Sequence, residues 1–420
     1  MSEPIHNPSA PPPTTGFTLL ELMVAMALSL VLFALAFTLV QQLDNTADVV
    51  GSMSDVNENL RAAVNMVSRD LSLAGENIPL GGIPLPYGNT ATAIKLPNPA
   101  YPAASPWTTW TTFPAPPAGV TSLFWPVITA GNAQGPTQGS GANAITTDIV
   151  TIISVNQTSL FNQTAVDTTA PNVPTISSGS ATITVTATAA GYVQPGQLIM
   201  LTNINGSCLL AVSSVSVGAT TGVITFKNGD TTNDLLGVNQ FSILSTGAVA
   251  FAVTSGPASG TISQLQTATQ TTKNGVTTTA YSWPTALTAY PITMVTYYLD
   301  TSTPQRNLMR LTTSTPVTLP PQPQAVALGI DAMQIQYSLS PPATLDGVQS
   351  DPTENPWPTT TDTGNSPNNI RKVVLMMIAE NNHQNHANGQ WYSKEIKNAV
   401  TVQNLDYHNK YNLGASLTAN

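Results

Sequence analysis

One uncharged stretch near the N-terminus constrains this chain more than any other feature. From Phe17 to Val40 there are 24 residues, and Glu21 is the only ionisable side chain among them. At about 1.5 Å per residue, a helix of this length spans a hydrocarbon core of roughly 30 Å. A carboxylate within such a segment costs on the order of a few kcal/mol in lipid. The stretch therefore predicts a membrane-spanning helix in which Glu21 has a function beyond anchoring.

Two simpler interpretations of this stretch fit less well. A secretory signal has a shorter apolar region of about 7–15 residues, followed by a small-residue cleavage site. Here the run is longer, and no Ala-x-Ala sequence follows it. A plain membrane anchor explains the length but explains neither Gly16 nor Glu21.

The residues around Gly16 resemble the class III signal of type IV prepilins and of type II secretion pseudopilins. The similarity lies in Gly16, then Phe17, then Glu21 five positions after the glycine, and then the apolar run. It implies that prepilin peptidase cleaves between Gly16 and Phe17, that the new amine of Phe17 is methylated, and that Glu21 has the family's acidic role. On a helix, Glu21 lies on the same face as Phe17, so its carboxylate can neutralise the Phe17 amine of a neighbouring subunit. The leader departs from the family because residues 1–16 contain no Lys or Arg.

The amino-acid composition excludes some classes of protein. Only 8% of the residues are charged, the net charge is −9, and the chain has 34 Pro and 28 Gly. Twelve scattered basic residues form no electrostatic footprint for nucleic acid, so no direct nucleic-acid binding is predicted. The single cysteine, Cys208, cannot form an internal disulfide, and its apolar neighbours indicate a buried structural thiol.

The chain divides into a helix and a large β-rich part, which predicts an α+β fold. Apolar residues continue at gaps of three and four to Ala74, Gly75 supplies a C-cap and Pro79 prevents continuation, so we expect a helix over 17–74 with Gly51 as a bend or weak point. The expected segments are a leader (1–16), a transmembrane or filament-core helix (17–40), its amphipathic continuation (41–75), a Pro/Thr-rich excursion (76–145) and a β-rich head (146–420).

Strands are expected through the head with turn residues between them, mostly antiparallel because no helix-length segment separates them. The predicted strands are 148–155, 181–188, 197–202, 209–217, 223–227, 241–245, 248–254, 292–299, 308–312, 332–338 and 372–380. The order of these segments resembles the large PilW-like minor pilins. Pro at the density of residues 76–141 argues against central strands there.

Several groups of residues are candidates for a metal site or a binding surface. Asp346, Asp351, Glu354 and Asp362 crowd a Pro- and Gly-rich loop that could hold Ca²⁺, although acidic loops are usually only solvated. His383 and His386, near Glu380, lie in a polar loop-like run and make a weak metal pair, and Asp230 and Asp234 are weaker still. The aromatic stretch Trp107–Trp125 is either a binding surface or, more often, a cover for a sheet. No catalytic motif is present, so we expect no enzymatic activity and no cofactor.

These features and the resemblance together predict a minor pilin of a type IV pilus. The resemblance implies that it acts in pilus assembly or priming, with roles in motility, adhesion or DNA uptake. Its expected partners are prepilin peptidase, other major and minor pilins, the inner membrane and the pilus assembly platform. We expect a single-pass inner-membrane protein with a periplasmic head that later reaches the pilus. The alternatives are a type II secretion pseudopilin and a binding module or enzyme displayed on a pilin-like stalk.

Overall fold

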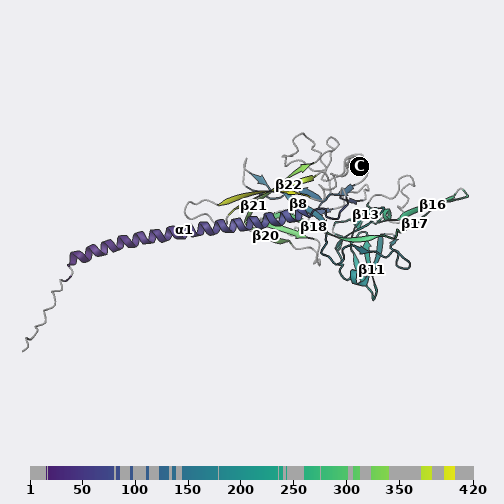
Figure 1. Ribbon diagram of the computed structural model, residues 1–420, viewed down its shortest axis with the longest axis horizontal. Coiled ribbons are helices and arrows are strands. Elements are labelled where there is room, and N and C mark those ends of the chain that lie inside the picture. Colours follow the sequence, from purple (N-terminus) through teal and green to yellow (C-terminus); the bar gives the residue numbers. More distant parts are fainter. Residues whose placement is uncertain are drawn as a thin grey trace, which may run out of the picture. The chain divides into compact units, whose positions relative to one another are not determined.

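A computed structural model provides the structure of the chain. It describes residues 16, 18–79, 82–85, 95–97, 110–112, 123–131, 135–138, 144–177, 179–234, 236–239, 243, 260–274, 276–300, 306–312, 323–339, 370–380 and 392–402. One long helix is followed by a large antiparallel β domain (Figure 1), which confirms the predicted α+β class.

Helix α1 (Leu19–Ser72) is continuous for 54 residues, close to the predicted 17–74. The expected bend or melting at Gly51 is not observed, because helical hydrogen bonding runs through that residue. After the helix, Gly75 adopts the left-handed conformation expected of a C-cap (φ +73°). Its N–H donates to the Ile153 carbonyl at 2.9 Å, so the turn is fastened directly to a strand of the β domain.

The chain forms two compact units, and the boundary between them falls within α1. The first comprises residues 1–55 and 383–392, and the second comprises residues 56–382 and 393–420. Within the second unit, α1 buries one stripe of apolar side chains at gaps of three and four. These side chains are Val56, Leu60, Ala63, Val64, Val67 and Leu71.

The largest sheet is organised around strand β18 (Thr288–Asp300). Strands β8 (Ile149–Val155) and β9 (Thr164–Ala165) pair along one edge of β18, and β12 (Leu198–Asn203) and β19 (Asn307–Thr312) share the other. The sheet continues through β5 (Ile128–Gly131) next to β8, β13 (Gly206–Ala211) next to β12, and β20 (Gln324–Leu328) next to β19. Every pair is antiparallel.

A second, four-stranded sheet packs with one end of the first. Its order is β10 (Thr175–Ser177), β11 (Ser180–Thr186), β15 (Thr221–Lys227) and β14 (Ser214–Val217). Short helix α2 (Ala187–Ala190) follows β11 and is capped by the Thr186 hydroxyl. Ile183 and Phe226 of this sheet share one apolar core with Leu201 and Leu210 of the first.

A third sheet contains β21 (Ile330–Leu339), β22 (Ile370–Glu380) and β23 (Ser393–Thr401) in that order. Buried Asp148, just before β8, joins it to the first sheet, because its N–H donates to the Met333 carbonyl and its Oδ2 accepts from the Ile335 N–H at 2.7 Å. Two side-chain contacts join β23 to α1. Lys394 Nζ donates to Asn57 Oδ1, and Asn398 donates to Ser68 Oγ.

The remaining described elements are short pairs and one 3-10 turn. They are β1 (Ile83–Leu85) with β4 (Leu123–Trp125), β2 (Lys95–Pro97) with β3 (Trp110–Thr112), β6 (Thr137–Gln138) with β7 (Ile145–Thr146), β16 (Thr267–Lys273) with β17 (Val276–Ser282), and η3 (Ile262–Leu265).

Eight of the predicted strands have counterparts at nearly the predicted positions, namely β8, β11, β12, β15, β18, β19, β21 and β22. The prediction of one strand over 209–217 was wrong: β13 and β14 are separate strands of different sheets, and the chain turns at Val212 and Ser213. Predicted strands 241–245 and 248–254 lie outside the described residues, except for residue 243. Strand β5, within the proline-rich stretch, is an outer strand that pairs only with β8, which agrees with the argument that proline density there excludes central strands.

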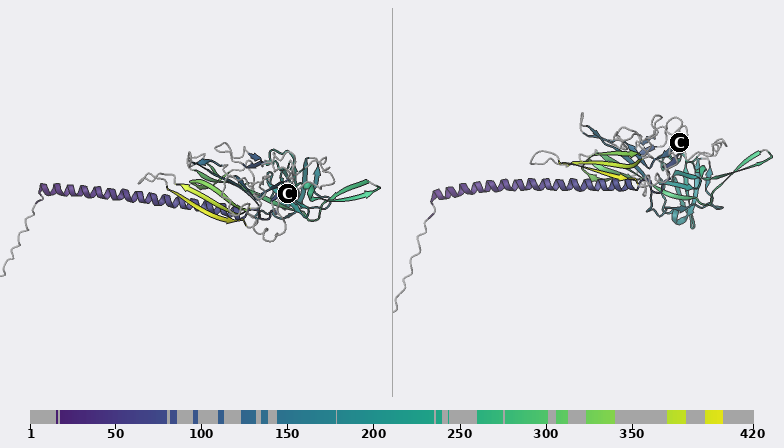
Figure 2. Two further views of the ribbon diagram at one scale, coloured as in Figure 1. Left: turned by 90° about the horizontal axis from the view of Figure 1, so that it is seen from above. Right: turned by 45° about the horizontal axis from the view of Figure 1, so that its top comes forward.

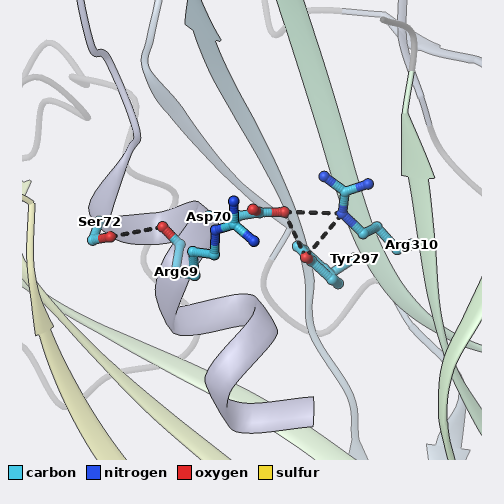
Figure 3. A network of polar contacts seen from close by, with 5 residues as sticks. All are labelled: Arg69, Asp70, Ser72, Tyr297 and Arg310. Carbon is cyan, nitrogen blue, oxygen red and sulfur yellow. Dashed lines mark hydrogen bonds and ion pairs between the residues drawn. The ribbon is translucent and has the colours of Figure 1, made fainter. Parts of the chain in front are cut away.

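A partly buried polar network fixes the end of α1 to the main sheet (Figure 3). Asp70 Oδ2 accepts from the Tyr297 hydroxyl at 2.6 Å and from Arg310 Nε at 2.9 Å, and Arg310 Nε also lies 3.1 Å from the Tyr297 oxygen. Burial and the nearby Asp70 charge raise the pKa of Tyr297, which keeps the phenol protonated as a donor. Breaking such a partly buried pair leaves an uncompensated charge, so the network favours one seating of the helix on β18 and β19.

We predict that Asp70→Ala lowers the free energy of unfolding by about 3 kcal/mol, because it leaves Arg310 without its partner. Tyr297→Phe removes the hydrogen bond that the phenol donates to Asp70 and the one that it accepts from Arg310, and it costs about 2 kcal/mol. Because both substitutions remove contacts of the same carboxylate, the double variant should lose less unfolding free energy than the two single variants lose together. Denaturant unfolding of the full chain in detergent measures this, with exposed Glu58→Ala as the control on the same helix. Additive effects would contradict a shared network.

Candidate functional site

The residues predicted to act in assembly lie where α1 begins. Thr18 immediately precedes the first helical residue, and its N–H and hydroxyl reach Glu21 Oε2 at 3.0 and 3.2 Å. In return, the Glu21 N–H reaches Thr18 Oγ1 at 3.3 Å. This reciprocal pair is a capping box, in which each side chain satisfies a backbone N–H that the first helical turn leaves unpaired.

The capping box gives Glu21 a partner within its own chain. Its carboxylate lies in the first turn, where the helix dipole favours negative charge. Sequence reasoning identified Glu21 and overlooked Thr18, although Thr-x-x-Glu before an apolar run is a known signature of a helix start. Gly16 is exposed, and an added side chain there would meet no other atom within 4 Å. Phe17 lies outside the described residues, so the cleavage and methylation sites stay predictions.

Beyond this start, α1 has an apolar surface that the described chain does not cover. Residues 18–44 are exposed, including large side chains such as Leu30, Phe33 and Phe37. The helix has the length and the composition of a membrane span. An uncovered apolar surface this long requires lipid or other apolar helices around it.

The other candidate sites gain no support. Asp346, Asp351, Glu354, Asp362, His383 and His386 lie outside the described residues, and Glu380 ends β22. Within the described part of the chain, no group of three or more His, Cys, Asp or Glu is placed to hold a metal ion. Trp107 lies outside the described residues, whereas Trp125 is fully buried, as expected of a residue that covers a sheet.

Asp230 and Asp234 serve as backbone acceptors. Asp230 accepts from the N–H groups of Thr232 and Asn233, which is a turn-forming role. Asp234 is buried and accepts from the N–H groups of Val238 and Asn239 at 3.0 and 2.7 Å. Burial raises the pKa of Asp234 to about 6, and the charge of Asp230 adds to this increase.

Cys208 is fully buried in β13, as predicted. Burial raises the pKa of its thiol, so the thiolate that reacts or binds metal is disfavoured. The described structure therefore offers a structural thiol.

Comparison with known proteins bears on the start of α1. Residues 14–37 match the family described as the prokaryotic N-terminal methylation motif. The match covers Gly16, Phe17 and Glu21 as well as Thr18 and most of the apolar run. No curated protein and no solved structure matches the chain.

Asp234 provides a prediction about pH. Because its pKa in the folded state exceeds its ordinary value of 3.8, the folded chain binds more protons than the unfolded chain between about pH 4 and pH 6. Its contribution to stability should therefore fall as pH rises through this window, by about 1.4 kcal/mol per pH unit.

Asp234→Asn, which does not titrate, is the reference for this measurement. Unfolding free energies of the two proteins, measured from pH 4 to pH 8, should differ by an amount that changes up to about pH 6 and is constant above it. Parallel curves over the whole range would show that Asp234 keeps an ordinary pKa.

Proposed function

We propose that this chain, which has the N-terminal methylation motif of type IV pilins and pseudopilins, is a large PilW-like minor pilin that acts in pilus assembly. The observation that carries the proposal is the start of α1, where an acidic capping box opens a long, uncovered apolar helix. A membrane anchor needs only the apolar length. Assembly into a filament explains why Glu21 is present and why it lies at the start of the helix.

The mechanism is a transfer of the apolar half of α1 between two apolar environments. In the membrane, Leu19–Val40 is surrounded by lipid, and in a filament the same surface packs against equivalent helices. Because both environments are apolar, the driving terms are close packing of side chains and the pairing of buried charges. The β domain stays in water throughout, as its neutral Thr- and Asn-rich surface requires.

Glu21 exchanges partners during this transfer. Before assembly, Thr18 satisfies the carboxylate, which lowers the cost of holding it near lipid. In the filament, the carboxylate pairs with the methylated amine of Phe17 from a neighbouring subunit. Each of these charges is costly alone in an apolar surrounding, and the two are stable only together.

The proposed partners follow from this mechanism. Prepilin peptidase removes residues 1–16, the inner membrane holds the subunit with its head in the periplasm, and other pilins take up the helix on the assembly platform. The size of the head favours a place at a pilus tip or priming complex, because a domain this large is awkward to repeat along a thin shaft. The chain is proposed to have no enzymatic activity and no cofactor.

The first prediction of this proposal concerns processing. Intact mass and N-terminal sequencing should show a mature chain that begins at methylated Phe17, produced only in cells that contain prepilin peptidase. Cells without the peptidase are the control and should keep residues 1–16. A chain that stays uncut in both, or that is cut after Val40, would mean an anchored or secreted β protein instead.

The second prediction separates the two roles of Glu21. Glu21→Val removes the cap and the charge, whereas Glu21→Gln keeps an oxygen that can cap Thr18 and removes only the charge. Both should be processed normally, because cleavage occurs at Gly16. Both should be absent from sheared pili, since neither can neutralise the Phe17 amine.

Immunoblots of membrane and sheared-pilus fractions measure this, with Asp44→Asn, an exposed carboxylate farther along the same helix, as the control. Normal incorporation of Glu21→Gln would eliminate charge pairing and leave capping as the function of Glu21. Normal processing and membrane insertion without any entry into pili, even for the unaltered chain, would favour the pseudopilin alternative.

A further inference from the structure

Strands β16 and β17 form a two-stranded ribbon that stands apart from the three larger sheets. They pair antiparallel from Thr267–Ser282 to Lys273–Val276, with Asn274 in the left-handed conformation of a tight turn (φ +54°). Figure 1 and both views of Figure 2 show the ribbon extending beyond the neighbouring strands of its domain. Among the described strands, no third one joins it.

The ribbon contributes little to the core of its own domain. All seven residues of β16 are exposed, and most of β17 is exposed as well, including Tyr281. Seven of its fourteen residues are Thr, and Lys273, next to the turn, is the only charged one. A two-stranded hairpin without an apolar face is marginally stable by itself. The ribbon is therefore expected to contact something outside its own domain.

The other long outer strands are partly protected against pairing with foreign strands. At the end of β13, the Asn239 side chain accepts from the Ala211 N–H at 2.8 Å and donates to the Ala211 carbonyl at 2.7 Å. On the outer edge of β21, Asp148 bonds the Met333 carbonyl and the Ile335 N–H. Outer strand β23 carries Lys394, Glu395 and Lys397, and such charges discourage edge pairing. Strands β10, β14 and β20 are short. Strand β17 is seven residues long and carries no charge, and among the described residues no side chain blocks its outer edge.

The base of the ribbon is held firmly on the β16 side. Asn203 Nδ2 donates to the Leu265 carbonyl at 2.7 Å, and Asn205 Nδ2 donates to Thr267 Oγ1 at 3.2 Å. Gln264 Nε2 donates to the Asn205 carbonyl at 3.2 Å. The turn between β12 and β13 thus lies against the start of β16. The open edge is that of β17.

Cross-strand contacts indicate which backbone groups of β17 point outward. Thr272 Oγ1 and Thr277 Oγ1 lie 3.0 Å apart, as in the close pairs of an antiparallel ladder that exchange no backbone hydrogen bonds with each other. The N–H and C=O groups of Thr277 therefore point away from β16. By the period of two along a strand, those of Thr279 and Tyr281 do so as well.

We propose that β17 pairs edge to edge with β17 of a second copy of this chain, antiparallel and centred on Thr279. In this register the two Thr279 residues exchange backbone hydrogen bonds, and each Thr277 lies opposite Tyr281 of the second copy, a favourable pairing of a β-branched and an aromatic residue. No like charges oppose each other, because the two Lys273 side chains lie at opposite ends of the four-stranded ribbon. A second copy supplies the uncharged, unprotected edge that this pairing requires.

Such an interface is weak by itself, because it buries little apolar area. It becomes effective where copies are concentrated, and a dense array of surface-displayed subunits provides this concentration. That last step rests on the proposed function, whereas the pairing itself does not. The experiment is therefore made on the purified full chain in detergent.

The test compares Thr279→Pro with Thr279→Ala. Proline removes the outward N–H of residue 279, which bonds nothing in the ribbon itself, and alanine changes only the side chain. Sedimentation velocity should show a dimer whose fraction rises with concentration for the unaltered chain and for Thr279→Ala. For Thr279→Pro the dimer association constant should fall at least about tenfold, because two symmetry-related hydrogen bonds are lost.

Hydrogen exchange on the same samples provides a readout specific to the ribbon. The amides of Thr277, Thr279 and Tyr281 should exchange rapidly in dilute protein and become protected as the dimer forms. Equal association of both variants would place any dimer elsewhere, for example on α1, and would overturn the proposal. Protection that appears only in membranes containing other proteins would also overturn it and assign the edge to a foreign strand.

Discussion

The structure depends on how the two halves of α1 are covered. From Val56 to Leu71 one stripe is buried against the β domain, and the Asp70–Tyr297–Arg310 network fixes its end. From Leu19 to Leu43 the side chains are exposed, and their printed hydrogen bonds stay within the helix and its capping box. The first half therefore depends on its environment for stability, which is the property expected of a helix that exchanges lipid for neighbouring subunits.

The features that could be predicted from the sequence are those that depend on the order of nearby residues. The uncharged run from Leu22 to Val40, the position of Glu21 and the apolar spacing up to Leu71 need no knowledge of the fold. Strands such as β8 and β22 were found because they are long apolar runs, and β8 is buried on both faces while β22 is buried on one. Ribbon β16–β17 was missed because its Thr-rich strands are solvated on both faces, so they show no alternation of apolar and polar residues.

Contacts between distant residues could not be read from one sequence. Asp70 and Arg310 lie 240 positions apart, and no local signal distinguishes Asp70 from the solvated carboxylates of the same helix. Asn239 looks like a loop residue, although it occupies the edge of β13 through Ala211. Thr18 is different, since its spacing to Glu21 is a local pattern that by itself predicts the capping box.

Gly51 lies where these two halves of the helix meet. It follows the exposed apolar half and precedes Val56, the first buried residue of the stripe, and a Cβ built there meets nothing within 4 Å. No packing requirement explains the glycine, which costs about 1 kcal/mol relative to alanine within a helix. The helix is nevertheless continuous through it. Its intrinsically weakest point thus falls between the exposed apolar part and the part that packs on the β domain. The proposed transfer from lipid to neighbouring helices would be served by compliance at this position, because the apolar part could then change its surroundings while the β domain keeps one fold.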